Sequence, residues 1–116
     1  MNDELRNAGL KDKLRYYFGL PRRLLALKVV GNSMSPSITA DDVILYDPVA
    51  VIEVGDIVLT AHPFMQSVKI VKRVAKIGAD SEVTLTGDNP AESTDSRTFG
   101  AVSVESIIGK VVCRLQ

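Results

Sequence analysis

The feature that most constrains the fold is a series of short runs rich in Val, Ile and Leu, each bounded by Gly, Pro, Asp or Asn. Short runs of β-branched residues between turn formers are typical of β-strands. Because no long helical pattern separates them, they predict an antiparallel sheet curled on itself, a partly open barrel, and a mainly β fold. The six predicted strands are residues 26–30, 43–46, 57–61, 68–75, 83–86 and 107–113.

The N-terminal part of the chain has a different pattern. Residues 3–18 predict one short helix with Asp3 as its N-cap. Gly19 and Pro21 would end this helix, because glycine favours a helix C-terminus and proline cannot continue one. Four apolar side chains share one face of the predicted helix at helical spacing, namely Leu10, Leu14, Tyr17 and Phe18.

The chain has 116 residues, which is enough for one hydrophobic core but not for two. We therefore expect residues 1–20 to form a helical arm and residues 21–116 to form a single β-rich domain. Acidic and basic residues balance at 14 each, so net charge gives no reason to expect nucleic-acid binding.

The basic residues are concentrated near the N-terminus. Residues 1–30 carry seven Lys or Arg and three acids, whereas residues 31–116 carry seven and eleven. A basic arm of this kind either makes a peripheral contact with anionic lipid, or binds an acidic partner, or is a solvated helix face.

Metal, disulfide and membrane-spanning functions have little support in the sequence. Cys113 is the only cysteine and His62 the only histidine, so neither an internal disulfide nor a zinc site is expected, and we expect no cofactor. No run reaches the roughly 18 apolar residues that a membrane span needs. The N-terminus also lacks the apolar core of a secretory signal, so a cytoplasmic location is expected.

A lysine stands out in the strand predicted at residues 68–75. Side chains alternate along a strand, so Lys72 shares a face with Val68, Ile70 and Val74, whereas Lys69, Val71, Arg73 and Ala75 share the opposite, solvent face. Burial disfavours the charged form of a lysine, and a neutral lysine can act as a general base. Alternatively, the side chain extends to the rim of the apolar face.

A serine-rich loop follows the strand predicted at residues 26–30. A hydroxyl nucleophile needs a sharp, exposed connection with backbone N–H groups near it. Gly31 permits unusual backbone angles, and Pro36 fixes the exit of the loop. Ser33, Ser35 and Ser37 all supply hydroxyls, and their composition does not choose among them. The same residues would also suit an ordinary turn.

The segment at residues 86–100 is dense in turn formers and carries Asp88, Asp95 and Arg97. A solvated loop held by side-chain hydrogen bonds and a local ion pair accounts for it.

Taken in order, these segments resemble the signal peptidase I family of serine peptidases. The resemblance covers residues 30–112 and includes NSMSPSI, VGDIV, VKIVKRV and GDNPAESTDSRTFG. It implies the catalytic-core fold of that family and a peptidase with a Ser-Lys dyad. Ser33 takes the nucleophile position and Lys72 the general-base position. Ser93 matches a serine that orients the lysine amine, and Asp95 with Arg97 matches a structural pair.

The chain departs from the family pattern in three respects. Many members place a serine two positions before the nucleophile, where this chain has Gly31, so the resemblance implies an oxyanion hole made by backbone N–H groups near Gly31 and Ser33. From the sequence, the membrane anchors of the export peptidases are not expected, and only fourteen residues separate Arg73 from Asp88 where those enzymes insert a β domain. It therefore looks most like the proteases that mature nickel-type superoxide dismutase, which remove a leader from a protein precursor.

Three other interpretations remain open. A self-cleaving peptidase of the repressor or mutagenesis-protein type also uses Ser-Met and Val-Lys-Arg, and Ala8–Gly9 is the kind of bond that it cuts. A generic signal peptidase would act on exported proteins. A non-catalytic β-barrel module would bind without reacting. A Ser-His-Asp triad through His62 is disfavoured, because His62 lies outside every matched segment.

Overall fold

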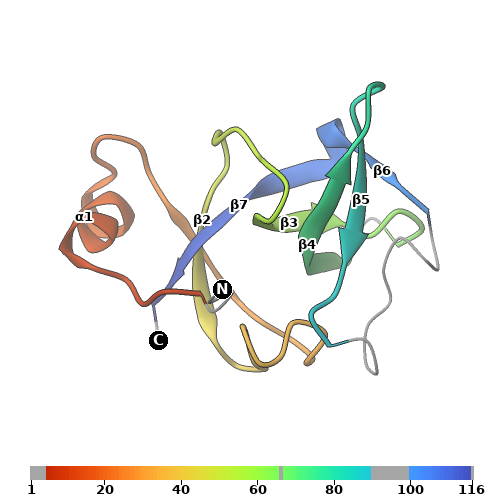
Figure 1. Ribbon diagram of the computed structural model, residues 1–116. Helices are drawn as coiled ribbons and strands as arrows, with labels where there is room; N and C mark the ends of the chain where they lie inside the picture. The colour runs from red at the N-terminus through yellow and green to blue at the C-terminus, as the bar shows by residue number, and fades with distance from the viewer. Residues whose placement is uncertain (1–4, 66, 90–99, 116) are drawn as a thin grey trace.

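The computed structural model describes residues 5–65, 67–89 and 100–115. They form one curved sheet of seven strands in the order β1-β2-β7-β3-β4-β5-β6, with every neighbouring pair antiparallel. Figure 1 shows the sheet bending from β2 and β7 on one side to β4, β5 and β6 on the other. The predicted fold class, a mainly β curled antiparallel sheet with a short helix, is confirmed.

All six predicted strands are present, with ends shifted by up to two residues. The two-residue strand β6 was not predicted, because so short a run carries no alternation. A 3₁₀ turn, η2 (Val104–Ser106), leads from it into the last strand. The strands are β1 (Leu25–Lys28), β2 (Val43–Asp47), β3 (Ile57–Ala61), β4 (Lys69–Ile77), β5 (Glu82–Thr86), β6 (Val102–Ser103) and β7 (Ile107–Arg114).

The helix is shorter than predicted. Helix α1 runs Leu10–Phe18, and its N-cap is Gly9 instead of Asp3. The carboxylate of Asp12 accepts the Gly9 N–H at 2.8 Å and so closes the first turn. The chain before Gly9 is extended because it pairs with the end of β7, where the Ala8 N–H donates to the Arg114 carbonyl at 2.7 Å. Gly19 ends the helix in a left-handed conformation, as predicted.

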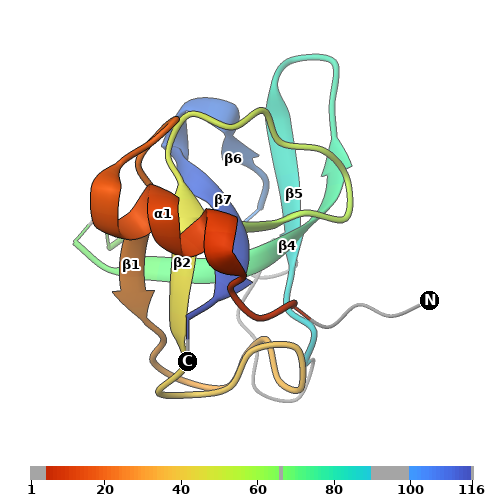
Figure 2. The ribbon, with the colours of Figure 1, turned by 90° about the vertical axis from the view of Figure 1, so that its left-hand side faces the viewer.

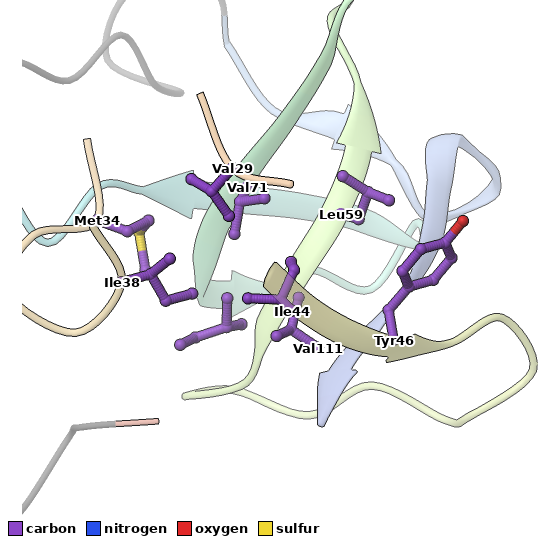
Figure 3. Packing of buried hydrophobic residues seen from close by; sticks show 9 residues of the cluster. Val29, Met34, Ile38, Ile44, Tyr46, Leu59, Val71 and Val111 are labelled. Atoms are coloured by element: carbon purple, nitrogen blue, oxygen red, sulfur yellow. The ribbon is translucent and has the colours of Figure 1, made fainter. Parts of the chain in front are cut away.

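The interior of the curved sheet holds the largest hydrophobic cluster. Its members come from four strands and from the loop after β1, as Figure 3 shows. Because the loop residues Met34 and Ile38 are part of this core, packing fixes the loop to the sheet. The cluster consists of Val29, Met34, Ile38, Ile44, Tyr46, Ile57, Leu59, Val71 and Val111.

Strand β4 is buried on both faces, which corrects one prediction. Val71 packs into the largest cluster, whereas Val74 packs into a second cluster with Val83 and Leu85. The face that was predicted to meet solvent therefore carries the core residue Val71. Arg73 on the same face is half-buried instead of exposed. The reason is the curl of the sheet, which encloses one end of β4. Among the described residues, no helix has the length and apolar content needed to cross a bilayer.

Candidate active site

Ser33 lies in the loop that connects β1 to β2. Gly31 adopts φ +83°, a left-handed conformation that side chains disfavour, and it turns the chain two residues before Ser33. Met34 directly after Ser33 is 2% exposed and buried in the core. The buried methionine anchors the loop, while the half-buried Ser33 is left on the surface of a pocket.

The closing segment, which follows β5 and carries Asp88 and Asn89, clamps this loop from the other side. The backbone N–H of Asn89 donates to the Ser33 carbonyl at 2.8 Å, and its side-chain amide donates to the Asn32 carbonyl at 3.1 Å. Within the loop, the Asn32 side chain accepts the Ala40 N–H at 3.1 Å. Residues far apart in sequence therefore fix the backbone on both sides of the Ser33 Cα.

Lys72 lies at the centre of β4, where it pairs in register with Val58 of β3. Its side chain is 3% exposed. Ser33 and Lys72 line the same pocket of about 360 Å³, together with Val30, Met65 and Val68. The structure thus brings the predicted nucleophile and the predicted general base to one cavity.

Ser33 also lines a second, smaller pocket of about 160 Å³. The wall of this pocket includes Leu27, Val29, Met34 and Val71, and is therefore mainly apolar. Ser33 lines both pockets, together with Val30 and Ile70.

The three serines of the loop, which composition alone did not distinguish, have different environments. The Ser37 hydroxyl is buried and donates to Asp88 Oδ2 at 2.6 Å, so it serves the architecture of the loop. Ser35 lines neither pocket, whereas Ser33 lines both. This arrangement favours Ser33 over the other two as the nucleophile.

An ion pair links β4 to the closing segment. Arg73 donates from Nε to Asp88 Oδ1 at 2.9 Å and from Nη2 to Asp88 Oδ2 at 2.7 Å. Burial by itself would raise the pKa of Asp88, but the hydrogen bonds from Arg73 and Ser37 outweigh it, and the pKa is lowered. Asp88 is therefore a carboxylate at neutral pH and holds both partners.

The VGDIV segment, residues 54–58, joins the same network. Gly55 has φ +96°, and its carbonyl accepts the third guanidinium hydrogen bond, from Arg73 Nη1 at 2.8 Å. The Gly55 N–H in turn donates to the Val74 carbonyl at 2.8 Å. The sequence identified this segment by resemblance alone. Its contacts indicate that it positions the β4 segment that carries Lys72.

His62 lies closer to the site than its place in the sequence suggested, because it lines the pocket shared by Ser33 and Lys72. Its Nδ1 accepts the backbone N–H groups of Phe64 at 3.1 Å and Met65 at 3.2 Å. The Nδ1 atom of His62 is therefore engaged by its own turn, whereas the buried Lys72 in the same pocket is the base that the motif resemblance implies.

Two backbone N–H groups near Ser33 are candidate oxyanion donors. Within the described part of the chain, the N–H groups of Gly31 and Ser33 donate to no other atom. Gly31 lines the same pocket as Ser33. Ser93, Asp95 and Arg97 lie outside the described residues, and their predicted roles stay predictions.

Two positioning residues were missed because single polar residues carry no periodic signal. Asn89 clamps the Ser33 loop, as described above. Arg114, at the end of β7, donates from Nε to Asp42 at 3.1 Å and from Nη2 to the Ser37 carbonyl. Cys113 is the buried core residue expected, and burial raises its pKa to about 11.

Comparisons with known proteins agree with this geometry. The sequence matches the Peptidase S24-like family over residues 7–112. It is 33% identical over 108 residues to mitochondrial inner membrane protease subunit 1 of Xenopus tropicalis. This match covers 73% of this chain and 65% of that protein. It is 33% identical over 72 residues to the Saccharomyces cerevisiae subunit 1, which covers 61% of this chain and 34% of that protein.

The chain therefore spans less than two thirds of the length of either relative. The predicted enzyme class, a peptidase of the serine type, is confirmed at the level of the family. The narrower resemblance to nickel-type superoxide dismutase proteases gains no support from these two relatives, because both are named as mitochondrial inner membrane protease subunits.

Proposed function

Because this chain belongs to the Peptidase S24-like family, we propose that it is a serine endopeptidase in which Ser33 is the nucleophile and Lys72 the general base. The observation that carries the proposal is the shared pocket. Two residues far apart in sequence line one cavity, and the lysine among them is 3% exposed. Burial favours the neutral amine, which is the form that can accept a proton.

The proposed mechanism is acyl transfer. The Lys72 amine takes the proton from Ser33 Oγ as this oxygen attacks the scissile carbonyl carbon. The backbone N–H groups of Gly31 and Ser33 donate to the oxyanion that forms. Collapse of the intermediate breaks the C–N bond, and the leaving amine takes the proton from Lys72. Water then attacks the acyl-enzyme, giving its proton to Lys72, and the acid product leaves with the Ser33 hydroxyl restored.

The supporting roles of three residues are proposed from the motif resemblance alone. Ser93 would hold the Lys72 amine toward Ser33, and Asp95 with Arg97 would hold the segment that carries Ser93. A residue that only orients the base should matter less than the base itself. Ser93→Ala should therefore lower kcat by about one to two decades, compared with near-complete loss for Lys72→Ala.

Labelling tests the chemistry without knowledge of the substrate. An inhibitor that acylates serine should raise the mass of the wild-type protein by one acyl group. The added mass should lie on the peptide that contains Ser33. Ser33→Ala should not be labelled, whereas Ser35→Ala should be labelled like the wild type. Absence of any label on the folded wild-type protein would favour the non-catalytic binding module.

The proposed substrate is a protein precursor with an extended leader peptide. The narrower proposal is the precursor of a nickel-type superoxide dismutase, in the cytoplasm. What supports it is the short connection between Arg73 and Asp88 and the GDNP-to-DSR segment. The names of the two relatives support instead a precursor processed at a membrane.

Co-expression distinguishes these substrates. The dismutase precursor is produced with the wild-type protein, with Ser33→Ala, or alone, and its N-terminus is measured by mass spectrometry. Removal of the leader only by the wild type supports the narrow proposal. An intact leader in all cultures, together with inhibitor labelling of Ser33, removes this substrate and leaves the peptidase chemistry standing.

Self-cleavage at Ala8–Gly9 is the alternative, and the contacts of Ala8 disfavour it within one molecule. The Ala8 N–H donates to the Arg114 carbonyl, and Ala8 packs against the cluster of Leu24, Leu45 and Cys113 instead of the Ser33 pocket. Incubation of the purified protein should leave its first eight residues in place. Their loss from the wild type but not from Ser33→Ala would establish self-cleavage.

A further inference from the structure

Helix α1 is attached to the protein with its apolar side outward. The four apolar residues predicted to share a face do share it, and that face is exposed: Leu10 is 75% exposed and Phe18 is 68% exposed. Leu14 and Tyr17 on this face are also exposed, as is Leu20, which follows two residues after the helix. We call these five residues the α1 stripe. Soluble helices normally turn such a face toward a core.

The opposite side of α1 is held to the body by polar contacts. Asp12 is buried and paired with Arg6 at 2.6 Å, and Arg15 donates to the buried Asp47 at 2.6 Å. Tyr16 packs on the cluster of Leu24, Leu45 and Cys113, which places the helix over β2 and β7. Figure 2 views this helix from its outer side. These contacts prevent α1 from rolling its apolar side inward.

Positive charge flanks the stripe on both sides. Successive residues of a helix are turned by about 100°, so Lys11 and Lys13 fall on opposite edges of the apolar stripe. Both are exposed, and neither forms an ion pair in the described part of the chain. Between residues 5 and 24, the one acidic side chain is Asp12, which is buried on the inner side. The outward surface of the arm is therefore apolar and cationic.

From this arrangement we infer that the α1 stripe is a docking surface for an anionic lipid bilayer. Apolar side chains with a lysine on each edge match a membrane interface, where the apolar residues enter the acyl boundary and the lysines meet anionic headgroups. A second copy of the chain fits less well, because a symmetric contact would bring lysine edges together. The inference goes beyond the proposed peptidase function and does not depend on it.

Vesicle sedimentation tests this inference. The purified chain is mixed with vesicles of phosphatidylcholine alone, or of phosphatidylcholine and phosphatidylglycerol in equal parts. We expect binding to the anionic vesicles at low salt, and weaker binding at high salt because counter-ions screen the charge. Leu10→Ser/Phe18→Ser should lower binding by at least about tenfold, since two exposed apolar anchors are lost. Lys13→Glu should lower it by about fivefold or more.

Two control variants test whether a loss of vesicle binding is specific to the α1 stripe. Val49→Ser/Val51→Ser alters a comparably exposed aliphatic pair in the loop between β2 and β3, and Lys76→Glu reverses an exposed lysine on β4. Both should bind vesicles like the wild type. Ser33→Ala should also bind like the wild type, so the vesicle test remains valid even if the proposed peptidase chemistry is wrong. Circular dichroism checks that each variant is folded.

Three outcomes would overturn the inference. One is equal binding of the wild type and the α1 variants to anionic vesicles, and another is no binding by the folded wild type. The third is a dimer in sedimentation equilibrium that Leu10→Ser/Phe18→Ser dissociates, which would assign the stripe to a second copy of the chain.

Discussion

Arg73 and Asp88 form a two-pronged ion pair beside the predicted general base, and this pair connects all four sequence motifs. The guanidinium also binds the Gly55 carbonyl, and the carboxylate also accepts the Ser37 hydroxyl. Gly55, Arg73, Asp88 and Ser37 each belong to a different motif. A single contact set therefore joins the four motifs in space.

The geometry of this pair predicts that lysine cannot replace Arg73. A lysine carries one point charge and cannot bind both carboxylate oxygens and the Gly55 carbonyl in the same fork. Because hydrogen bonds to a charged group contribute about 1.5–3 kcal/mol each, Arg73→Lys should lower the free energy of unfolding by about 2–4 kcal/mol. Urea denaturation at pH 7 measures this change.

The peptidase activity of Arg73→Lys should fall together with its stability. Loss of the fork loosens the loop on one side of Ser33 and the strand that carries Lys72. At a temperature where Arg73→Lys is fully folded, we expect kcat to fall more than KM rises. Wild-type kcat in the folded Arg73→Lys protein would contradict the positioning role.

Ser33 and Ser37 should differ in their effect on stability. Ser37→Ala leaves the Asp88 carboxylate without a buried hydroxyl donor and should cost about 1–3 kcal/mol of unfolding free energy. Ser33→Ala removes a half-buried hydroxyl on a pocket wall, so its cost should stay within about 0.5 kcal/mol. Thermal unfolding of the two variants compares them directly. A Ser33→Ala protein that is the less stable of the two would mean that Ser33 is an architectural residue.

Most of the fold was predictable because strands leave a clear local pattern. Every predicted strand exists, since short β-branched runs between turn formers have few alternative structures. The start of α1 was not predictable. Asp3 has the chemistry of an N-cap, but pairing of residues 6–8 with Arg114 keeps that segment extended. That pairing joins opposite ends of the chain, and no local pattern reports it.

The site was predictable in part for the same reason. Alternation correctly indicated that Lys72 is buried, but it placed Arg73 on a solvent face. The curl of the sheet, a property of all seven strands together, turns that face toward Asp88. Apart from the motif resemblance, local composition could not separate Ser33 from Ser37, because Ser37 differs by a hydrogen bond to a residue 51 positions away.

Acid should weaken the attachment of the N-terminal arm. The hydrogen bonds from Arg6 have the largest effect on the pKa of Asp12 and lower it. Burial raises this pKa, and the hydrogen bond from the Gly9 N–H lowers it further. The pKa of Asp12 is about 2, compared with an ordinary value of 3.8. A carboxyl whose pKa is lower in the folded state stabilises the fold at pH values above its unfolded-state pKa. This stabilisation is lost as the pH falls through its folded-state pKa. With solvent screening at the exposed Arg6, we expect a loss of about 1–2 kcal/mol between pH 4 and pH 2.

Unfolding free energies of the wild type and Asp12→Asn measure this effect. The difference between them should be largest near pH 7 and should shrink as the pH approaches 2. A difference that does not change with pH would mean that the ionised carboxylate of Asp12 does not stabilise the arm.

The last prediction separates the lysines of β4. Lys72→Met keeps most of the side-chain volume but removes the amine, so cleavage of a precursor should fall to the level of Ser33→Ala while the protein stays folded. Lys69 lies at the rim of the smaller pocket, so the better control is Lys76→Met, an exposed lysine on the same strand that should be nearly silent. The rate of the wild type should rise with pH and level off below the roughly 10.4 of a free lysine, because burial favours the neutral amine. An active Lys72→Met protein would refute the dyad. An active Lys72→Met together with an inactive Lys76→Met would move the base to the solvent end of β4.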